Sequence, residues 1–219
     1  MKKRSVSFGN YITADYGWTV TGITLSAPEQ KTNYVEKVGG DGSWDLSTVL
    51  TDGIPKYKNR TLTVTMELSI GDRDEREQII NAMVMELDGQ EKHIVLPDRP
   101  EHYLVGRIRT AVNYSDLAHA AVTITANVEP WFSHSRESRV ELVATSTEAT
   151  AYIYNHGGRH VVPMLSVIGD ITVKVGDAET KLAAGFYKWP ALILPPGLTT
   201  IGYSGDGILA LNYREGVLR

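Results

Sequence analysis

The sequence contains no cysteine among its 219 residues. This absence excludes a disulfide-stabilised scaffold, a cysteine-ligated zinc site and a cysteine nucleophile, and it fits a protein that folds in a reducing cytoplasm. Apolar runs are short, and none approaches the ~20 residues of a membrane-spanning helix. The basic start, Met1 to Arg4, is followed by alternating residues instead of the apolar core of a signal peptide. We therefore expect a protein that is made in the cytoplasm and does not insert into a membrane.

Positive charge is not in excess, because 22 Lys and Arg residues stand against 26 Asp and Glu residues and give a net charge of −4. This balance argues against a protein that coats nucleic acid. Recognisable catalytic motifs are also scarce. Gly202–Gly205 begins like a nucleophile elbow, but Asp206 displaces the final glycine and no helix follows, so a hairpin turn is favoured. No pair of carboxylates stands out for glycoside hydrolysis. We predict no catalytic residue.

Metal-binding patterns are weak as well. His156 and His160 are four residues apart, but two glycines lie between them, so no helical face aligns them on a zinc ion. Asp41, Asp45 and Asp52 lack the spacing of an EF-hand and are typical of an Asp/Gly-rich loop that makes local turns. We predict no metal site and no cofactor.

A single strong helix signal runs from Asp72 to Asp88. Asp72 is suited to be the N-cap, since its carboxylate can accept an otherwise unpaired backbone N–H, and Glu75 completes a capping box. Apolar residues recur at helical spacing and form one stripe, which we read as core, and Gly89 supplies the left-handed stop. The stripe consists of Ile80, Met83, Val84 and Leu87.

Three segments around this helix alternate as strands with one apolar face and one small polar face. They are 61–70, 103–112 and 117–129, and a turn at 113–116 joins the last two. Such alternation is typical of an antiparallel sheet with one wet side. The two arginines of the middle segment fit a solvated face or a subunit contact better than an anion site. The polar candidates are Thr63, Thr65, Glu67, Thr123, Thr125, Arg107 and Arg109.

The segment 39–57 is rich in turn-forming residues and is too long for an ordinary connection. It nevertheless carries Trp44, Leu46 and Leu50. Apolar residues in a long exposed loop predict that the loop docks, either onto its own domain or onto a neighbouring subunit.

Pro130 marks the expected domain boundary, which divides the chain into 1–130 and 131–219. Beyond it, short strand signals follow one another without a helix and predict a β-sandwich of jelly-roll type. The fold class is thus mainly β, with an α+β N-terminal domain. Four aromatic residues of the second domain could stack on sugar rings, although half-buried strand positions are the more ordinary interpretation. They are Tyr152, Tyr154, Tyr187 and Trp189.

The order of these elements, over essentially the whole chain, resembles the distal tail protein family of long, non-contractile-tailed phages and their prophages. Short motifs accompany that order at both ends of the chain. They are Phe8–Gly9, Gly40–Gly42, Asp45–Ser47, Asn59–Arg60, Pro195–Gly197 and Leu211–Gly216, together with the helix at 72–88.

The resemblance implies a structural hub of the virion tail tip, assembled in the host cytoplasm, and not an enzyme. The N-terminal domain would have the tail-tube fold and form a hexameric ring around a channel that lets DNA pass without binding it specifically. The C-terminal domain would be galectin-like and peripheral. The partners would be the tail tube protein and a tail-associated, fibre or receptor-binding protein. No inserted carbohydrate-binding module is evident.

Two other functions stay open at this point. The first is a carbohydrate-binding adhesion protein that acts through the C-terminal sandwich and its four aromatic residues. The second is a hydrolase of cell-wall or polysaccharide substrates, for which the sequence nominates no carboxylate pair. Ring assembly, glycan binding and hydrolysis are the measurements that separate the three.

Overall fold

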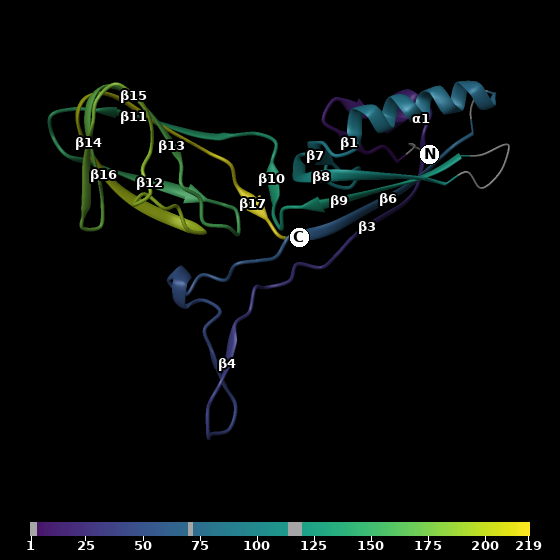
Figure 1. Ribbon diagram of the computed structural model, residues 1–219. Helices are drawn as coiled ribbons and strands as arrows, with labels where there is room; N and C mark the ends of the chain where they lie inside the picture. The colour runs from purple at the N-terminus through teal and green to yellow at the C-terminus, as the bar shows by residue number, and fades with distance from the viewer. Residues whose placement is uncertain (1–3, 70–71, 114–119) are drawn as a thin grey trace. The chain divides into compact units, whose positions relative to one another are not determined.

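The structure is a computed structural model that describes residues 4–69, 72–113 and 120–219. The chain divides into two compact units (Figure 1), Met1–Pro130 and Trp131–Arg219. We call them the first and the second unit. The described chain is mainly β, as predicted, with α1 (Arg73–Leu87) as its α-helix.

The first unit is an antiparallel sheet with the strand order β2-β1-β7-β8-β9-β6-β3. In β6 and β9, every second side chain is buried, because successive residues of a strand point to opposite faces of the sheet. The two strands pair residue for residue from Arg60↔Val128 to Leu68↔Ala120. The bounds are β1 Ser7–Phe8, β2 Tyr11–Ile12, β3 Thr19–Leu25, β6 Arg60–Leu68, β7 Glu91–Val95, β8 His102–Asn113 and β9 Ala120–Val128, with the 3-10 helix η1 at Thr13–Tyr16.

The helix α1 packs beside β8 and contributes three buried side chains to the core (Figure 1). Ile80, Met83 and Leu87 are almost fully buried, and Val84 is half-buried, so the apolar stripe is confirmed. Fully burying a side chain of this size contributes about 1.5–3 kcal/mol. The helix therefore covers the apolar face of the sheet, whereas the side chains of the opposite, polar face are exposed or half-buried.

Both ends of α1 are set by single residues. The Asp72 carboxylate accepts the backbone N–H of Glu75 at 2.9 Å, which confirms the predicted N-cap. At the other end, Asp88 is already extended, and Gly89 follows with φ of 71°. The Gly89 N–H then donates to the Ile108 carbonyl of β8 at 2.9 Å. The left-handed glycine thus turns the chain directly into the sheet.

The expected loop at 39–57 is part of a longer paired segment, which we call the arm (29–59). β4 (Tyr34–Glu36) and β5 (Ser43–Asp45) form its hairpin, and the 3-10 helix η2 (Val49–Thr51) follows. Nearer the sheet, Gln30 bridges to Tyr57, and the Lys58 N–H donates to the Glu29 carbonyl at 2.8 Å. The arm therefore continues the β3–β6 pair (Figure 1). The prediction of a loop at 39–57 missed β5, because a short strand that faces water on both sides carries little apolar alternation.

The second unit is a β-sandwich made largely by two long strands, β13 (Met164–Val175) and β16 (Gly197–Tyr213), which pair along their length. One layer joins β12 (Ala149–Asn155), the first half of β16, the second half of β13 and β14 (Ala178–Leu182). The other joins β11 (Ser138–Ala144), the second half of β16, the first half of β13 and β15 (Gly185–Lys188). We call these the first and the second layer.

Glycines allow each long strand to pass from one layer to the other. Gly169 in β13 has φ of 86°, and Gly205 and Gly207 in β16 have φ of 131° and 152°. A Cβ at any of these three positions would lie about 2 Å from a backbone oxygen of the paired strand. The hairpin turn favoured for Gly202–Gly205 was therefore wrong, since Gly169 and Gly205 lie at bends within continuous strands.

The core of the second unit lies between its two layers. Leu165, Val173, Ile201, Leu209 and Leu211 are fully buried there. Beside it, Val161 and Leu194 form an isolated bridge. A short ladder of β10 (Phe132–His134) with β17 (Gly216–Val217) brings the two ends of the unit together.

Candidate interaction surfaces

The polar face of the first unit's sheet is a continuous surface. The register places Thr63 of β6 opposite Thr125 of β9, and Thr125 opposite Arg109 of β8. In the next row, Thr65 lies opposite Thr123. All these side chains are exposed or half-buried, whereas their sequence neighbours face the core. The structure thus brings six of the seven predicted residues onto one stretch of one face, and Glu67 extends it along β6.

Charges of both signs are spread along this face. Arg107 of β8 lies opposite Glu91 of β7, and one of its Nη atoms donates to the Gly89 carbonyl at 2.5 Å. A shallow depression of about 870 Å³ lies over this region, with Arg107, Arg109 and Glu91 in its lining. Neither sign dominates, so the face presents neither a strong anion site nor a cation site.

The β8 edge of this surface is closed by the end of the helix. The Asp88 carboxylate accepts the backbone N–H of Thr110 at 2.7 Å and its hydroxyl at 2.9 Å. Both hydrogen bonds lower the pKa of the Asp88 carboxyl, and the bond from the Thr110 backbone N–H has the larger effect. The carboxylate therefore takes the place of a missing strand partner at this point of β8.

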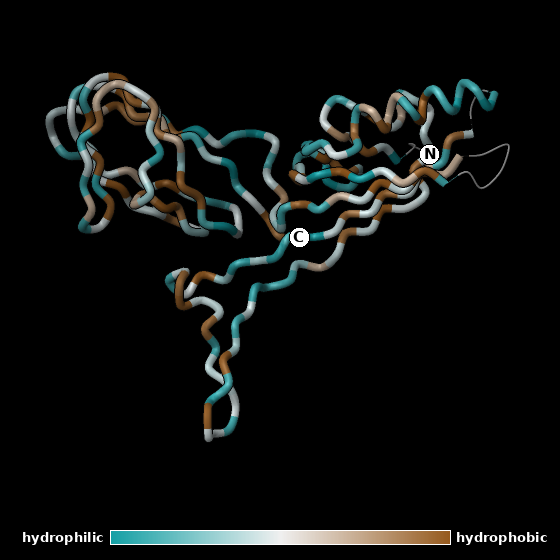
Figure 2. Tube along the Cα trace, viewed as in Figure 1, coloured by the Kyte–Doolittle hydropathy of each residue, from teal (hydrophilic) through white to brown (hydrophobic). Residues whose placement is uncertain are grey.

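The arm carries its apolar side chains into solvent. Trp44 is 58% exposed, Leu50 is 95% exposed, and Leu46 is exposed as well. No residue from 29 to 59 is buried. Figure 2 shows hydrophobic positions at several places in the arm, separated by hydrophilic ones. Docking onto its own domain, one of the two predicted alternatives, is therefore wrong, and docking onto a neighbouring subunit stays a prediction.

The four aromatic residues proposed for sugar stacking do not form one surface. Tyr152 and Tyr154 are exposed on the outside of β12, and the Tyr154 ring lies 4.4 Å from the ring of His156. Tyr187 and Trp189, in contrast, pack partly buried against the core of the sandwich. The alternation of β15 explains this difference, since it turns Tyr187 inward and Phe186 outward.

Two further features concern metal ions and membranes. Within 4–69, 72–113 and 120–219, no group of three or more His, Asp or Glu side chains is placed to hold a metal ion. Over the same ranges, no helix is both long and apolar enough to cross a bilayer.

Comparison with known proteins gives one clear result. No protein-family model matches the sequence, and no curated protein matches it. A solved structure does match: the crystal structure of the Dit (gp 19.1) protein of SPP1, described as a paradigm of the hub adsorption apparatus in phages that infect Gram-positive hosts. The TM-score is 0.73 at 14% identity, over 98% of this chain and 99% of that one. The chain has the Dit fold. The resemblance to distal tail proteins is thereby confirmed at the level of the fold.

Part of the polar face of the Dit-like first unit is not predictable from strand alternation. β3 adds Thr24 opposite Thr63, and the Thr21 hydroxyl donates to the Thr65 hydroxyl at 3.2 Å. A bulge between Val20 and Gly22 shifts the register, so the alternation of β3 breaks midway. The run of threonines at 19, 21 and 24 is the signal that could have revealed this edge.

Proposed function

We propose that this protein is a structural hub of a phage tail tip. Its copies form a ring, a hexamer by resemblance to distal tail proteins, that joins the tail tube to the host-adhesion apparatus and leaves a central channel for DNA. The partners are the tail tube protein on one side and a tail-associated, fibre or receptor-binding protein on the other. The role is structural. The observation that carries the proposal is agreement with the Dit fold along both units, over 98% of the chain.

The polar sheet face suits the wall of such a channel. Its threonines are small and uncharged, Arg107 lies opposite Glu91, and Glu67 adds a second negative charge to the same face. A densely basic wall would neutralise phosphates and hold the DNA by counterion release. A face of mixed charge and many hydroxyls instead allows DNA to pass without specific binding.

The arm suits the contact between copies. A two-stranded hairpin alone is at best marginally stable in water, and this one exposes Trp44 and Leu50. Because these apolar side chains are exposed in their own chain, a different surface of the next copy would cover them. Contacts of this head-to-tail kind close into rings. Obligate interfaces of this sort bury about 2,000 Å² or more.

Assembly of the purified full chain tests the proposal. Light scattering after size exclusion is expected to give six times the 24.1 kDa of the chain, and negative-stain images are expected to show a ring with a central hole. Some ring proteins assemble only on the neighbouring proteins of the tail, so the measurement is repeated with the co-expressed tail tube protein. A monomer at high concentration in both preparations would contradict the hub function.

Carbohydrate binding by the second unit is a second candidate, and one observation favours it. Tyr152 and Tyr154 are exposed on the same face of β12, with His156 beside them. Exposed aromatic rings at this spacing can stack on sugars. A glycan array probed with the full chain is the test. A binding signal that is lost in Tyr152→Ala and Tyr154→Ala would support carbohydrate binding by the second unit. An array without any signal would exclude this function.

A further inference from the structure

The outer face of the second layer in the second unit carries a contiguous apolar patch. Val143, Ile208 and Ile168 lie side by side on β11, β16 and β13. Phe186 of β15 lies opposite Ser166, between Ile168 and Met164 along β13. Phe186 is 79% exposed, and Val143, Ile168 and Met164 are exposed as well. We call these five side chains the outer patch. Single exposed apolar residues are ordinary, but a cross-strand cluster marks an interaction site.

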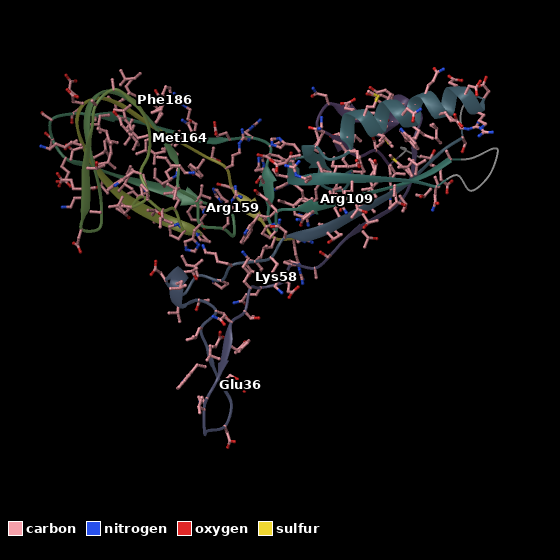
Figure 3. All side chains as sticks on the ribbon, viewed as in Figure 1. Glu36, Lys58, Arg109, Arg159, Met164 and Phe186 are labelled. Atoms are coloured by element: carbon pink, nitrogen blue, oxygen red, sulfur yellow. The ribbon has the colours of Figure 1, made fainter. Side chains whose placement is uncertain are left out.

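A basic hollow of about 330 Å³ adjoins this patch. Met164 belongs to both. The hollow is also lined by Arg159, His160, Lys188 and Arg214, which outnumber the acidic Glu137 in its lining. Lys188 lies directly opposite Met164 in the pairing of β13 with β15 (Figure 3 labels Met164, Phe186 and Arg159). An apolar surface and a positively charged recess therefore share a border.

The charges of the hollow are only partly compensated within the unit. Arg214 donates to the Ser135 carbonyl at 2.6 Å and lies 4.0 Å from the Glu137 carboxylate. Arg159 uses one Nη to bond the Arg214 carbonyl at 3.2 Å. Among the residues that the structure describes, no hydrogen bond or ion pair involves the Lys188 ammonium. An incoming carboxylate thus finds free donors on Lys188 and Arg159.

We propose that this face docks another protein of the tail through a segment that presents an apolar side chain next to an Asp or Glu. The apolar side chain covers Phe186 and Met164, and the carboxylate binds Lys188 and Arg159 in the hollow. That the partner is a tail protein rests on the proposed hub function, whereas the chemistry of recognition rests on this surface. A second copy is the weaker occupant, because two such faces in a symmetric contact would bring the Lys188 and Arg159 charges of both copies together.

A random 12-residue peptide library displayed against the immobilised full-length protein tests the docking chemistry. We expect the enriched peptides to combine an aromatic or large aliphatic residue with an Asp or Glu within a few positions. Fluorescence polarisation of these synthetic peptides should show at least tenfold weaker binding to Phe186→Ser and to Lys188→Glu. Changing the acidic residue of a peptide to Lys should restore its binding to Lys188→Glu.

Matched variants on the first layer serve as controls. Leu198→Ser and Lys181→Glu make the same chemical changes at exposed positions of β16 and β14, and they should leave peptide binding unchanged. No enrichment, enrichment without acidic residues, or equal binding to all variants would overturn the proposal. Light scattering on the same proteins distinguishes the docking proposal from the hub function. Loss of assembly in Phe186→Ser would show that the outer patch is a contact between copies and would overturn the docking proposal. Absence of assembly in every protein, including wild type, would count against the hub function and not against the docking chemistry.

Discussion

At the residue scale, one end of the first unit depends on a buried pair of aromatic side chains. The Trp18 indole N–H donates to the Tyr11 hydroxyl at 2.8 Å, and both residues are almost fully buried. The Tyr16 ring stacks on Tyr11 with the ring centroids 4.3 Å apart. Burial raises the pKa of Tyr11 to about 12, because a phenolate would lose its hydration there. The pair therefore combines apolar burial with a hydrogen bond that satisfies the buried Trp18 N–H, and the effect of burial on the Tyr11 pKa outweighs the opposite effect of that hydrogen bond.

Tyr11→Phe should lower the free energy of unfolding by about 1–3 kcal/mol, since it leaves the buried Trp18 N–H without an acceptor. The raised pKa also gives a pH dependence. The wild-type contribution is complete below the unfolded pKa of about 10 and is lost as the pH rises towards 12. Urea midpoints should therefore differ most at pH 8 and converge above pH 10. Equal midpoints at pH 8 would show that the hydrogen bond adds nothing.

Met83 places the helix stripe in the core, where its side chain is fully buried. Met83→Asp should prevent the first unit from folding. An unpaired carboxylate buried there costs several kcal/mol, a large part of the 5–15 kcal/mol that stabilises a typical domain. Met85→Asp is the matched control, because Met85 is 85% exposed only two residues away. Soluble yield and circular dichroism measure the outcome, and a cooperatively folded Met83→Asp protein would contradict this placement of the helix.

At the element scale, the end of α1 is tied to β8 by the Asp88 carboxylate and Thr110. Because these hydrogen bonds lower the pKa of Asp88, its contribution is present above the unfolded pKa of about 3.9 and is lost as the pH falls through the folded value. Asp88→Asn should therefore be less stable than wild type at pH 7 and closer to it at pH 3. Denaturant midpoints at the two pH values test this, with Asp98→Asn as the control for charge. If the midpoints of Asp88→Asn and wild type differed by the same amount at both pH values, the charge of the Asp88 carboxylate would not stabilise the fold.

The arm should contribute to assembly and little to folding. Leu50→Ser is expected to weaken association between copies roughly ten- to a hundredfold, as about 1.5–3 kcal/mol of side-chain burial is lost. The melting temperature of the isolated chain should not change, because Leu50 is 95% exposed. Met85→Ser is the control outside the arm. Sedimentation velocity over a concentration series measures the association, and unchanged assembly in Leu50→Ser and Trp44→Ser would exclude the arm as the subunit contact.

Alternation predicted the elements whose two faces differ most. Thr61–Leu68 and Ala120–Val128 bury every second residue, so their polar faces could be assigned before their pairing was known. The placement of Arg109 beside Thr125 and Thr63 could not be predicted in this way, because the register depends on strands that are distant in sequence. The bends at Gly169 and Gly205 look like turns in the sequence, since glycine serves both purposes. The predicted turn at 113–116 lies, apart from Asn113, outside the described residues.

At the scale of the whole molecule, each unit holds its own core. The side chains of α1 and the sheet form one, and the space between the two layers of the sandwich holds the other. The β10–β17 ladder pairs the start of the second unit with its end, through Phe132↔Val217. Each unit therefore has its own set of buried apolar residues.

The separation of cores implies a separation of roles, which two fragments divided after Pro130 can test. Fragment 131–219 should fold cooperatively with about 4–13 kcal/mol of stability, from the usual 0.05–0.15 kcal/mol per residue, and should remain monomeric. Fragment 1–130 contains both the arm and the polar face, so it should associate as the full chain does. Urea unfolding and light scattering on both fragments measure this. If fragment 1–130 stays monomeric while the full chain forms a ring, then contacts made by the sandwich close the ring, and the assignment of the subunit interface to the arm is wrong.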